Sequence, residues 1–379
     1  MPAATTSSPP AAAYRPSAAL KVVEHGSGSL AKLPEVLKLL NVTKPFIVTG
    51  QSVRERTPII DNVLGILGRD DVVVFSAIKQ HAPIADIRDA LRIFKESGSD
   101  GILAIGGGSP VDSGKIIAYH LLEQSSTKIP LIAVPTTFSV AETTPAAGYT
   151  NEEGHKTTVL DPTIAPEAII YDAEVLQYTP LRLLLSSGIR AVDHAVETLY
   201  ATNISEVPFK PLALSALSDL FKYLPLLKED PKNTEIGQML FNAAFLSLFP
   251  RYTLEGGLGL SHRLGHALGA KYGIPHGITS CATLAASVNY KATSDPYAAA
   301  QLQRAIPFLG LDQASDAETR GRAVAAAIAR LVDTLGLTTK LGEYSVPVAD
   351  VPKIALHAVG GDPESPEYGA VQELVRSLY

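Results

Sequence analysis

GILAIGGGSPVDSGK, residues 101–115, is a short apolar run that leads directly into three consecutive glycines and then into a helical pattern. Pro110 is expected to open this helix at a first-turn position, where proline is favoured. Glycines lack Cβ atoms, so their backbone N–H groups can approach a pyrophosphate, and the helix N-terminus adds the positive end of its dipole. We therefore predict a phosphate-binding turn formed by Gly106, Gly107, Gly108 and Ser109. Because glycine-rich turns are common, an ordinary strand-to-helix turn is the alternative.

Other apolar runs surround this strand along the chain. They are rich in β-branched residues, are bounded by Gly, Pro or Asp, and cover residues 45–50, 71–77, 130–137 and 168–172. Such continuous runs are typical of strands that are covered on both faces. Between them, residues 84–96 and 110–122 repeat apolar side chains at helical spacing. The alternation predicts an α/β domain with a parallel, doubly wound sheet over residues 20–180, the architecture of a dinucleotide-binding domain.

Strand signals nearly vanish after residue 180. Helical periodicity is found at 181–202, 208–227, 235–248, 258–271, 278–290, 296–306 and 319–335. We therefore place a domain boundary near residue 180 and predict an all-helical domain over residues 181–379. Residues 1–19 are rich in Ala, Pro and Ser and have no apolar signal core, so we expect a disordered tail there.

Composition excludes several classes of protein. Apolar residues make up 46% of the chain and charged residues 18%, which suits a buried core. The net charge is −6 and no Lys/Arg-rich run occurs, so we expect no nucleic-acid partner. No run approaches the roughly 18 apolar residues of a membrane span. The single cysteine, Cys281, excludes an internal disulfide and fits a reducing compartment, so we expect a cytoplasmic protein. We also expect a small-molecule substrate.

Three histidines are spaced so that their side chains can converge. His262 and His266 are four residues apart, so they share one face of a helix, and His276 follows a Gly-Ile-Pro break that can return the chain to that face. Such a group is typical of a divalent metal site or of a proton-transfer site. Upstream, Arg190 and His194 share a helical face in the same way.

Arg190 argues against a metal ion. Its guanidinium group has no lone pair to donate and stays protonated. Two unit charges about 4 Å apart interact by about 4 kcal/mol at an effective dielectric constant near 20, and a divalent ion would be repelled about twice as strongly. Asp193 is expected to point about 100° away from His194 around the helix and so not to replace a missing ligand. We therefore expect no metal.

Several separated motifs resemble the iron-containing alcohol dehydrogenase superfamily over about residues 20–379. They are GGGSPVDSGK (106–115), VPTTFSVAETTP (134–145), Lys156 before TTVLDPTIAPEAIIYD, SGIRAVDHAVETLYA (187–201) and HRLGHALGAKYGIPHG (262–277). The chain is most similar to the maleylacetate reductase branch, because His81-Ala82-Pro83 follows the second strand and Ser-Gly-x-x-Ala begins the helix at 187. The resemblance implies a cofactor, NADH or NADPH, in a cleft between the two domains, and a homodimer.

The resemblance also implies which residues hold the cofactor. They are Gly50, Ser52, the glycine turn, Asp112, Thr136, Thr137 and Lys156. No acid follows the strand at 45–50 to grip the ribose hydroxyls, so NADPH is weakly favoured, with Ser52 or Arg54 near its 2′-phosphate. The alternative is that Gly50 merely forms a turn. Val140 and Ala141 stand where the family normally has Gly and Ser.

Metal-dependent relatives hold their ion with an Asp at the position of Arg190 and with histidines that match His194, His262 and His276. Because the Asp is missing here, the chain resembles the metal-independent maleylacetate reductases. We assign Arg190 to stabilise developing negative charge, and His266, with an ordinary pKa near 6.5, to donate a proton at neutral pH. His194, His262 and His276 would then bind or orient the substrate.

Two enzymatic functions remain open at this stage. The first is an NAD(P)H-dependent, metal-independent oxidoreductase that reduces an oxo acid, an enone or a related carbonyl. The second, suggested by Val140 and Ala141, is non-redox acid–base chemistry on the same scaffold: a dehydratase, isomerase or cyclase, possibly in secondary metabolism. A non-catalytic binding protein is the third possibility. An apolar wall of the site would come from Phe138, Phe249, Tyr252 and Leu258.

Overall fold

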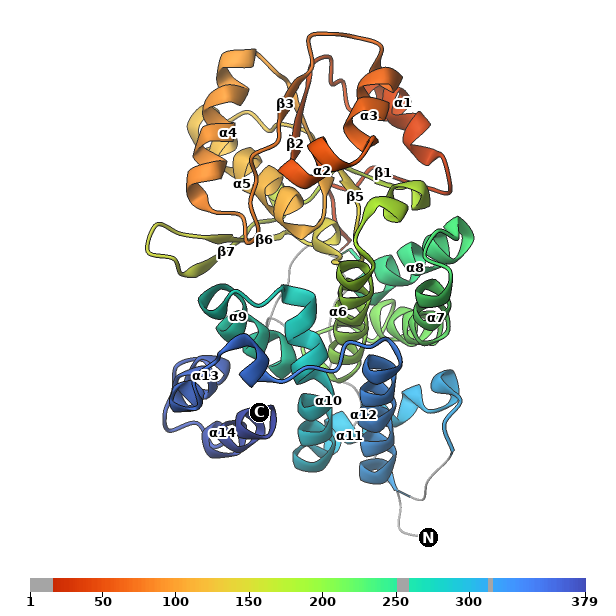
Figure 1. The fold of residues 1–379 in the computed structure, drawn as a ribbon, viewed down its shortest axis with the longest axis vertical. Coiled ribbons are helices and arrows are strands. Elements are labelled where there is room, and N and C mark those ends of the chain that lie inside the picture. Colours follow the sequence, from red (N-terminus) through yellow and green to blue (C-terminus); the bar gives the residue numbers. More distant parts are fainter. Residues whose placement is uncertain (1–15, 251–258, 313–315) are drawn as a thin grey trace.

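The computed structural model describes residues 16–250, 259–312 and 316–379. A sheet flanked by helices forms one half of the molecule and a group of helices forms the other, as Figure 1 shows. Most of the tail expected over residues 1–19 lies outside the described residues, and so do Tyr252 and Leu258. Within the described ranges, no helix combines the length and the apolar character that crossing a membrane requires.

The main sheet is parallel throughout. Its strands are β1 (Val22–His25), β2 (Pro45–Thr49), β3 (Val73–Phe75), β4 (Gly101–Gly106), β5 (Leu131–Pro135) and β8 (Ala168–Tyr171), in the order β1-β8-β5-β4-β2-β3. The predicted runs correspond to β2, β3, β4, β5 and β8, so the predicted doubly wound sheet is confirmed. β1 was not predicted, because VVEH is short and only partly buried at the edge of the sheet.

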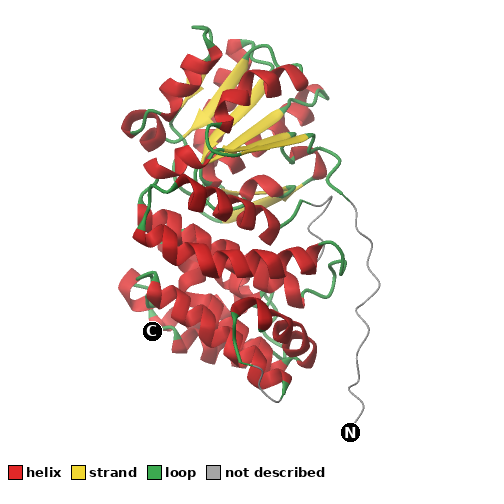
Figure 2. Ribbon diagram, turned by 90° about the vertical axis from the view of Figure 1, so that its right-hand side faces the viewer, coloured by secondary structure: helices red, strands yellow, loops and turns green. Residues whose placement is uncertain are grey.

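Helices cover both faces of this sheet, which is why its strands are apolar on both sides (Figure 2). α1 (Leu33–Leu39) and α3 (Ile59–Leu67) pack over one face, and α4 (Ile84–Ser97) and α5 (Gly108–Ser125) pack over the other. Successive residues of β4 alternate accordingly: Ile102 and Ala104 belong to one core, and Leu103 and Ile105 belong to the other.

The strand order creates a crevice at one place in the sheet. β2 and β4 are neighbours, but the chain leaves β2 toward β3 and leaves β4 toward β5, on opposite sides. In open α/β sheets, ligands bind outside the carboxyl ends of the strands at such a switch point. Gly50, the residue before the short helix α2 (Gln51–Arg56), and the glycine turn after β4 both lie at this point.

A two-stranded hairpin, which we did not predict from the sequence, extends from the sheet. β6 (Ala146–Thr150) and β7 (Lys156–Leu160) pair antiparallel, and Figure 1 shows them between the sheet and α9. Lys115 of α5 fixes its base, because the buried Lys115 Nζ donates to the carbonyl oxygens of Thr144 at 2.7 Å and Ala146 at 2.8 Å. Burial lowers the pKa of Lys115 to about 8.

Helices make up nearly all of the regular structure after residue 180. They are α6 (Leu181–Tyr200), α7 (Phe209–Glu229), α8 (Thr234–Ser247), α9 (Leu260–Tyr272), α10 (His276–Ser294), α11 (Pro296–Leu302), α12 (Ala317–Thr334), α13 (Val351–Ala358) and α14 (Tyr368–Ser377). α6 is buried along most of its length. The predicted helices correspond to α6–α12 with small shifts at their ends, whereas α13 and α14 were not predicted.

Close packing of α6 against α10 generates the first prediction. A Cβ atom on Gly277 would lie 2.6 Å from the backbone carbonyl carbon and oxygen of Ser186, which cannot yield as a flexible side chain can. We expect Gly277→Ala to destabilise the protein by about 1–3 kcal/mol, measured by denaturant unfolding. Gly65→Ala in α3 is the matched control, because a Cβ there meets nothing within 4 Å. Equal stability of the two variants would contradict the observed α6–α10 contact.

Candidate active site

The glycine turn leaves polar groups next to it without partners. β4 ends at Gly106, whose φ of 145° favours glycine, and α5 begins at Gly108. A Cβ on Gly107 would lie 3.2 Å from Thr137 Cγ2, so a larger residue there would crowd the side chain of Thr137. The buried hydroxyls of Thr137 and Ser139 have no hydrogen-bond partner among the described residues. Unpartnered hydroxyls beside a helix N-terminus can donate hydrogen bonds to the phosphates or the amide of a dinucleotide.

The structure gathers most of the predicted cofactor residues around this turn. Thr136 N donates to Gly106 O at 2.9 Å. A Cβ on Gly148 of the hairpin would lie 3.1 Å from Lys156 Nζ and 3.8 Å from Asp112 Oδ2, which brings these two side chains together. Gly148 N donates to the same Asp112 oxygen at 3.2 Å.

Gly50 and Ser52 lie at the end of the neighbouring strand β2. A Cβ on Gly50 would lie 3.3 Å from Ile78 O, so close packing favours glycine here. This agrees with the alternative interpretation, in which Gly50 serves the turn and not the cofactor. Ser52 is exposed at the start of α2. Arg54 pairs with Asp61, so part of its charge is already compensated.

Val140, at a position where the family resemblance implies Gly, adopts a backbone conformation that favours glycine. Its φ of 59° and ψ of 19° are left-handed, although its side chain is branched at Cβ and fully buried. Such a residue is a true conformational outlier, with a strain of order 1–3 kcal/mol. Phe138, expected in an apolar wall of the site, is also fully buried and packs against Phe241 with ring centroids 5.4 Å apart. The two side chains therefore contribute to the core of the helical part.

The predicted histidines converge. His262 and His266 lie on one face of α9 and meet rings from two other helices. The rings of His194 and His262 are 4.7 Å apart, and His266 stacks on His276 at 5.6 Å. His194 Nδ1 and His262 Nε2 are buried and have no hydrogen-bond partner within the part of the chain that the structure describes.

Arg190 lies among these imidazoles, with 4% of its surface exposed. Its Nη1 donates to Ser280 Oγ at 3.0 Å and lies 3.4 Å from Asp193 Oδ2, while Nη2 contacts His276 Nε2. The guanidinium group therefore occupies the space between α6 and α10.

Asp193 lies close to His262, a contact that the sequence analysis did not predict. Asp193 Oδ1 lies 3.3 Å from His262 Nδ1, and Oδ2 accepts hydrogen bonds from the hydroxyls of Ser261 at 2.8 Å and Ser280 at 2.6 Å. Asp193 does leave α6 at a different angle from His194, but α9 and α10 pack against that side of α6 and bring His262 and Ser280 to it.

Glu197 was not identified from the sequence. Its Oε2 accepts from His262 Nδ1 at 2.6 Å and from Gly259 N at 2.6 Å, and Oε1 accepts from Ser261 N at 2.9 Å. It thus satisfies backbone donors at the start of α9 and orients His262. The available signal was Asp193 and Glu197, two acids four residues apart on a helix that is otherwise mainly apolar.

The electrostatic environment divides the histidines. Burial, followed by Arg190, lowers the pKa of His266 to about 3, and it lowers the pKa of His276 well below its ordinary value. Burial, then His262, has the same effect on His194. Burial and Arg190 also lower the pKa of His262, but Asp193 and Glu197 outweigh them, so the net shift is upward. The expectation that His266 keeps an ordinary pKa near 6.5 is therefore wrong: it is neutral at pH 7.

Asp193, Glu197 and His262 present donor atoms that all lie within 4.8 Å of one another. These groups already take part in hydrogen bonds with backbone N–H groups and hydroxyls, and with one another, as described above. Their arrangement is therefore accounted for as a network around His262.

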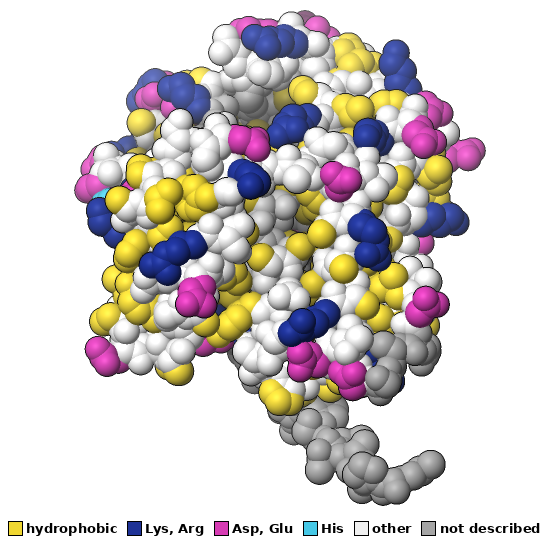
Figure 3. Space-filling view, turned by 60° about the horizontal axis from the view of Figure 1, so that its bottom comes forward, with side chains coloured by type: hydrophobic (Ala, Val, Ile, Leu, Met, Phe, Trp, Pro, Cys, Tyr) yellow, Lys and Arg dark blue, Asp and Glu magenta, His cyan; other side chains and the backbone are white. Residues whose placement is uncertain are grey.

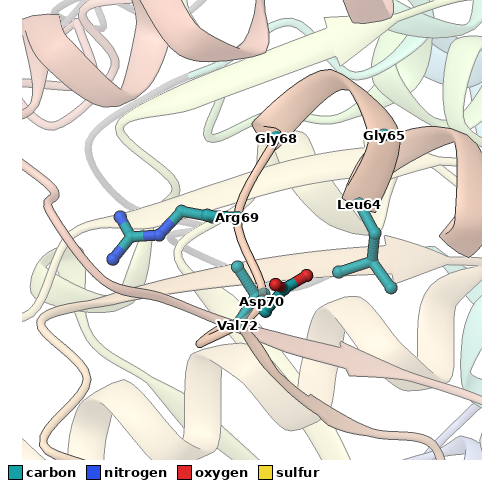
Figure 4. A pocket seen from close by; sticks show the side chains of 6 residues that line it. All are labelled: Leu64, Gly65, Gly68, Arg69, Asp70 and Val72. Atoms are coloured by element: carbon teal, nitrogen blue, oxygen red, sulfur yellow. The ribbon is translucent and has the colours of Figure 1, made fainter.

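Two further views place this site in the context of the described surface. Figure 3 shows charged side chains of both signs scattered over one face of the molecule, without a basic patch there. A separate pocket at the end of α3, shown in Figure 4, is lined by Leu64, Gly65, Gly68, Arg69, Asp70 and Val72. None of these six residues belongs to the histidine cluster or to the glycine turn.

Comparisons with known proteins cover almost the whole described chain. The family model named iron-containing alcohol dehydrogenase matches residues 21–173, and the model named Fe-containing alcohol dehydrogenase family, C-terminal, matches residues 184–379. Maleylacetate reductase of Rhizobium sp. (strain MTP-10005) is 30% identical over 74% of each chain. The corresponding enzyme of Sphingobium indicum is 29% identical over 93% of this chain and 94% of its own.

A solved structure of a maleylacetate reductase has the same fold as this chain. The crystal structure of maleylacetate reductase from Agrobacterium tumefaciens superimposes with a TM-score of 0.80 at 26% identity, covering 97% of this chain and 98% of that one.

The buried neutral histidines generate a prediction for stability against pH. Below about pH 6.5 the unfolded chain protonates its histidines, but the folded state resists this at His266, whose pKa is about 3. The unfolded state then binds more protons, so the free energy of unfolding falls as the pH falls, by up to about 1.4 kcal/mol per pH unit for this residue.

We therefore expect His266→Gln to lose stability less steeply than the wild type between pH 6.5 and pH 4.5, measured by urea unfolding. His155→Gln, at an exposed site on the hairpin, serves as the control and should keep the wild-type slope. Parallel curves for the wild type and His266→Gln would show that His266 titrates normally in the folded protein.

Proposed function

We propose a function from one premise: this chain belongs to the iron-containing alcohol dehydrogenase family, in its maleylacetate reductase branch. It uses NADH or NADPH to reduce the carbonyl or the conjugated double bond of a small oxo acid, and it does so without a metal ion. The observation that carries this proposal is the buried guanidinium group of Arg190 among the four histidines.

The glycine turn and its surroundings would hold the cofactor. Backbone N–H groups at the start of α5 and the unpartnered hydroxyls of Thr137 and Ser139 supply donors, and Lys156 supplies a positive charge at the hairpin. When bound, the nicotinamide supplies the hydride. The absence of an acid after β2 supports a weak preference for NADPH. Two contacts weaken this argument: Gly50 packs closely against the backbone of Ile78, and Arg54 forms an ion pair with Asp61.

The helical part would supply charge stabilisation and the proton. Arg190 places a fixed positive charge in a site where water is largely excluded, so it can stabilise the oxyanion or enolate that forms as hydride is transferred. His262 lies between two carboxylates that raise its pKa, and its unpartnered Nε2 can donate to the same oxygen when the ring is protonated. His266 is neutral and only partly buried. It can therefore act as a proton relay: one ring nitrogen gives its proton to the substrate while the other takes up a proton from solvent.

The residues at the family's metal position do not fit a divalent ion. A guanidinium group stands at the position of the missing acid, and it contacts His276 Nε2, the atom through which that ring could bind a metal. Metal binding would require Arg190 to leave its contacts with Ser280 and Asp193 as well. We therefore propose a metal-independent reaction.

We also propose, by analogy with the family, that the protein is a cytoplasmic homodimer with a small-molecule substrate. The maleylacetate reductases among its relatives do not favour the alternative of non-redox acid–base chemistry. That alternative is distinguished directly by whether NADPH is consumed.

Turnover of two variants tests the assigned roles. With maleylacetate and NADPH or NADH, we expect Arg190→Ala and His266→Ala each to lower kcat by at least about tenfold, because each removes stabilisation of the transition state. Consumption of the nicotinamide absorbance at 340 nm is the measurement, and circular dichroism confirms folding. His155→Ala is the control. Wild-type rates from both variants would remove these residues from the mechanism, and no cofactor consumption by the wild type with any oxo acid would refute the reductase itself.

Metal content tests the role of Arg190 independently of activity. We expect the purified wild type to contain far less than one Fe or Zn per chain by mass spectrometry, and to keep its activity in EDTA. Arg190→Asp with Asp193→Ala restores an acid at the family's ligand position and removes the partner of Arg190, so this double variant is expected to bind about one zinc ion per chain. One tightly bound ion per wild-type chain, lost together with activity on chelation, would contradict the proposal.

A further inference from the structure

A tight turn after β3 holds two residues in a conformation that is unfavourable for them. His81 and Ala82 have φ values of 65° and 49°, although neither is glycine. Left-handed residues other than glycine persist only where their surroundings enforce them, and they cluster at functional sites.

The surroundings that enforce this turn come from the glycine turn and the β6–β7 hairpin. His81 N donates to Ser109 Oγ at 3.0 Å, at the glycine turn. Thr150 of the hairpin donates from Oγ1 to His81 O at 3.1 Å and from its N to Ala82 O at 3.1 Å. The backbone of His81 is therefore fixed between the glycine turn and the hairpin.

The side chain of His81 reaches the helical part. A Cβ built on Gly269 of α9 would lie 3.9 Å from His81 Cε1 and also 3.9 Å from His276 Nδ1. The adjoining ring atom, His81 Nε2, is buried and has no hydrogen-bond partner among the residues described. A residue of the sheet domain thus presents an unpartnered ring nitrogen beside the histidines of α9 and α10.

The charged groups near His81 Nε2 indicate whether an anion or a cation would bind there. The ammonium group of Lys156 interacts with the rings of His81, His266 and His276, and burial followed by Lys156 lowers the pKa of His81. A neutral imidazole can offer one N–H donor. Lys156 is the charged group that acts on His81, so an oxygen anion is favoured over a cation as the partner of this ring.

We propose that His81 contacts the substrate and that its Nε2–H donates a hydrogen bond to a substrate carboxylate. His81 then selects oxo acids over uncharged carbonyl compounds, and it does so from the cofactor domain, opposite Arg190. This inference rests on the proposed reductase function and adds to it the residue that recognises the acid group.

The experiment compares His81→Ala and His81→Gln with the wild type, with maleylacetate as the substrate. A hydrogen bond to a charged group contributes about 1.5–3 kcal/mol, so we expect the KM of His81→Ala to rise roughly 10–100-fold while kcat changes much less. His81→Gln places an amide N–H near the lost donor and is expected to recover part of the KM. His155→Ala, a histidine substitution on the exposed end of the hairpin, is the matched control.

Binding of NADPH, followed by nicotinamide fluorescence, separates the other outcomes. The Kd for NADPH should be the same in His81→Ala and in the wild type. A weaker Kd for NADPH with an unchanged KM for maleylacetate would make His81 a cofactor residue and overturn the proposal, and so would unchanged values of both constants. An equal loss of kcat and rise of KM in His81→Ala and His81→Gln, with a lowered Tm in both, would indicate a purely structural role.

A direct binding measurement keeps the inference separate from the reductase function. If the wild type does not reduce maleylacetate, the proposed substrate fails, but His81 can still be tested with maleate in the presence of NADP. In ¹⁵N spectra of histidine-labelled protein, the Nε2 signal that is lost in His81→Gln should shift when maleate is added. A signal that stays in place at saturating maleate would overturn the carboxylate contact.

Discussion

Arg190 brings a permanent positive charge into the centre of the helical part, and the surrounding residues are arranged to compensate it. A buried cation without partners would be strongly unfavourable. Here Asp193 lies beside the guanidinium group, and Glu197 one turn later faces His262. The raised pKa of His262 and the lowered pKa of Asp193 both reflect this pairing of acidic and basic groups. This balanced cluster lets α6, α9 and α10 pack closely around polar side chains.

The same cluster determines the chemistry available to the other histidines. His194, His266 and His276 face burial and the positive charge of Arg190 or His262 but contact neither carboxylate closely, so they remain neutral. His262 alone is held by two acids. The pKa of one imidazole is therefore raised and the pKa values of the other three are lowered, because only His262 has two carboxylates beside it. Replacing Arg190 therefore removes its contact with His276 and also changes the pKa values of the neighbouring histidines.

The sequence predicted the fold through features that depend on local chemistry. β-branched runs bounded by glycine identify strands covered on both faces, and these were found, whereas β6 and β7 are partly exposed and lie outside the main sheet. The histidines were found because a spacing of four residues places side chains together on any helix. Glu197 and the contacts of Asp193 could not be predicted, since they depend on how α9 packs against α6. His81 acts through a turn whose backbone is set by Ser109 and Thr150, which are distant in sequence.

Replacing a metal ion by an arginine restricts the reaction, on the mechanism proposed here. A metal is a Lewis acid that lowers the pKa of a bound alcohol enough for it to lose its proton before hydride leaves. A guanidinium group stays protonated and cannot accept that proton, so it stabilises an oxyanion only by charge and hydrogen bonds. Replacing the metal ion by a guanidinium group therefore slows the oxidation of a simple alcohol more than it slows the reduction of a carbonyl group that is already electron-poor. An oxo acid or a conjugated enone spreads the developing charge over its own atoms, which is the kind of substrate that one fixed cation can support.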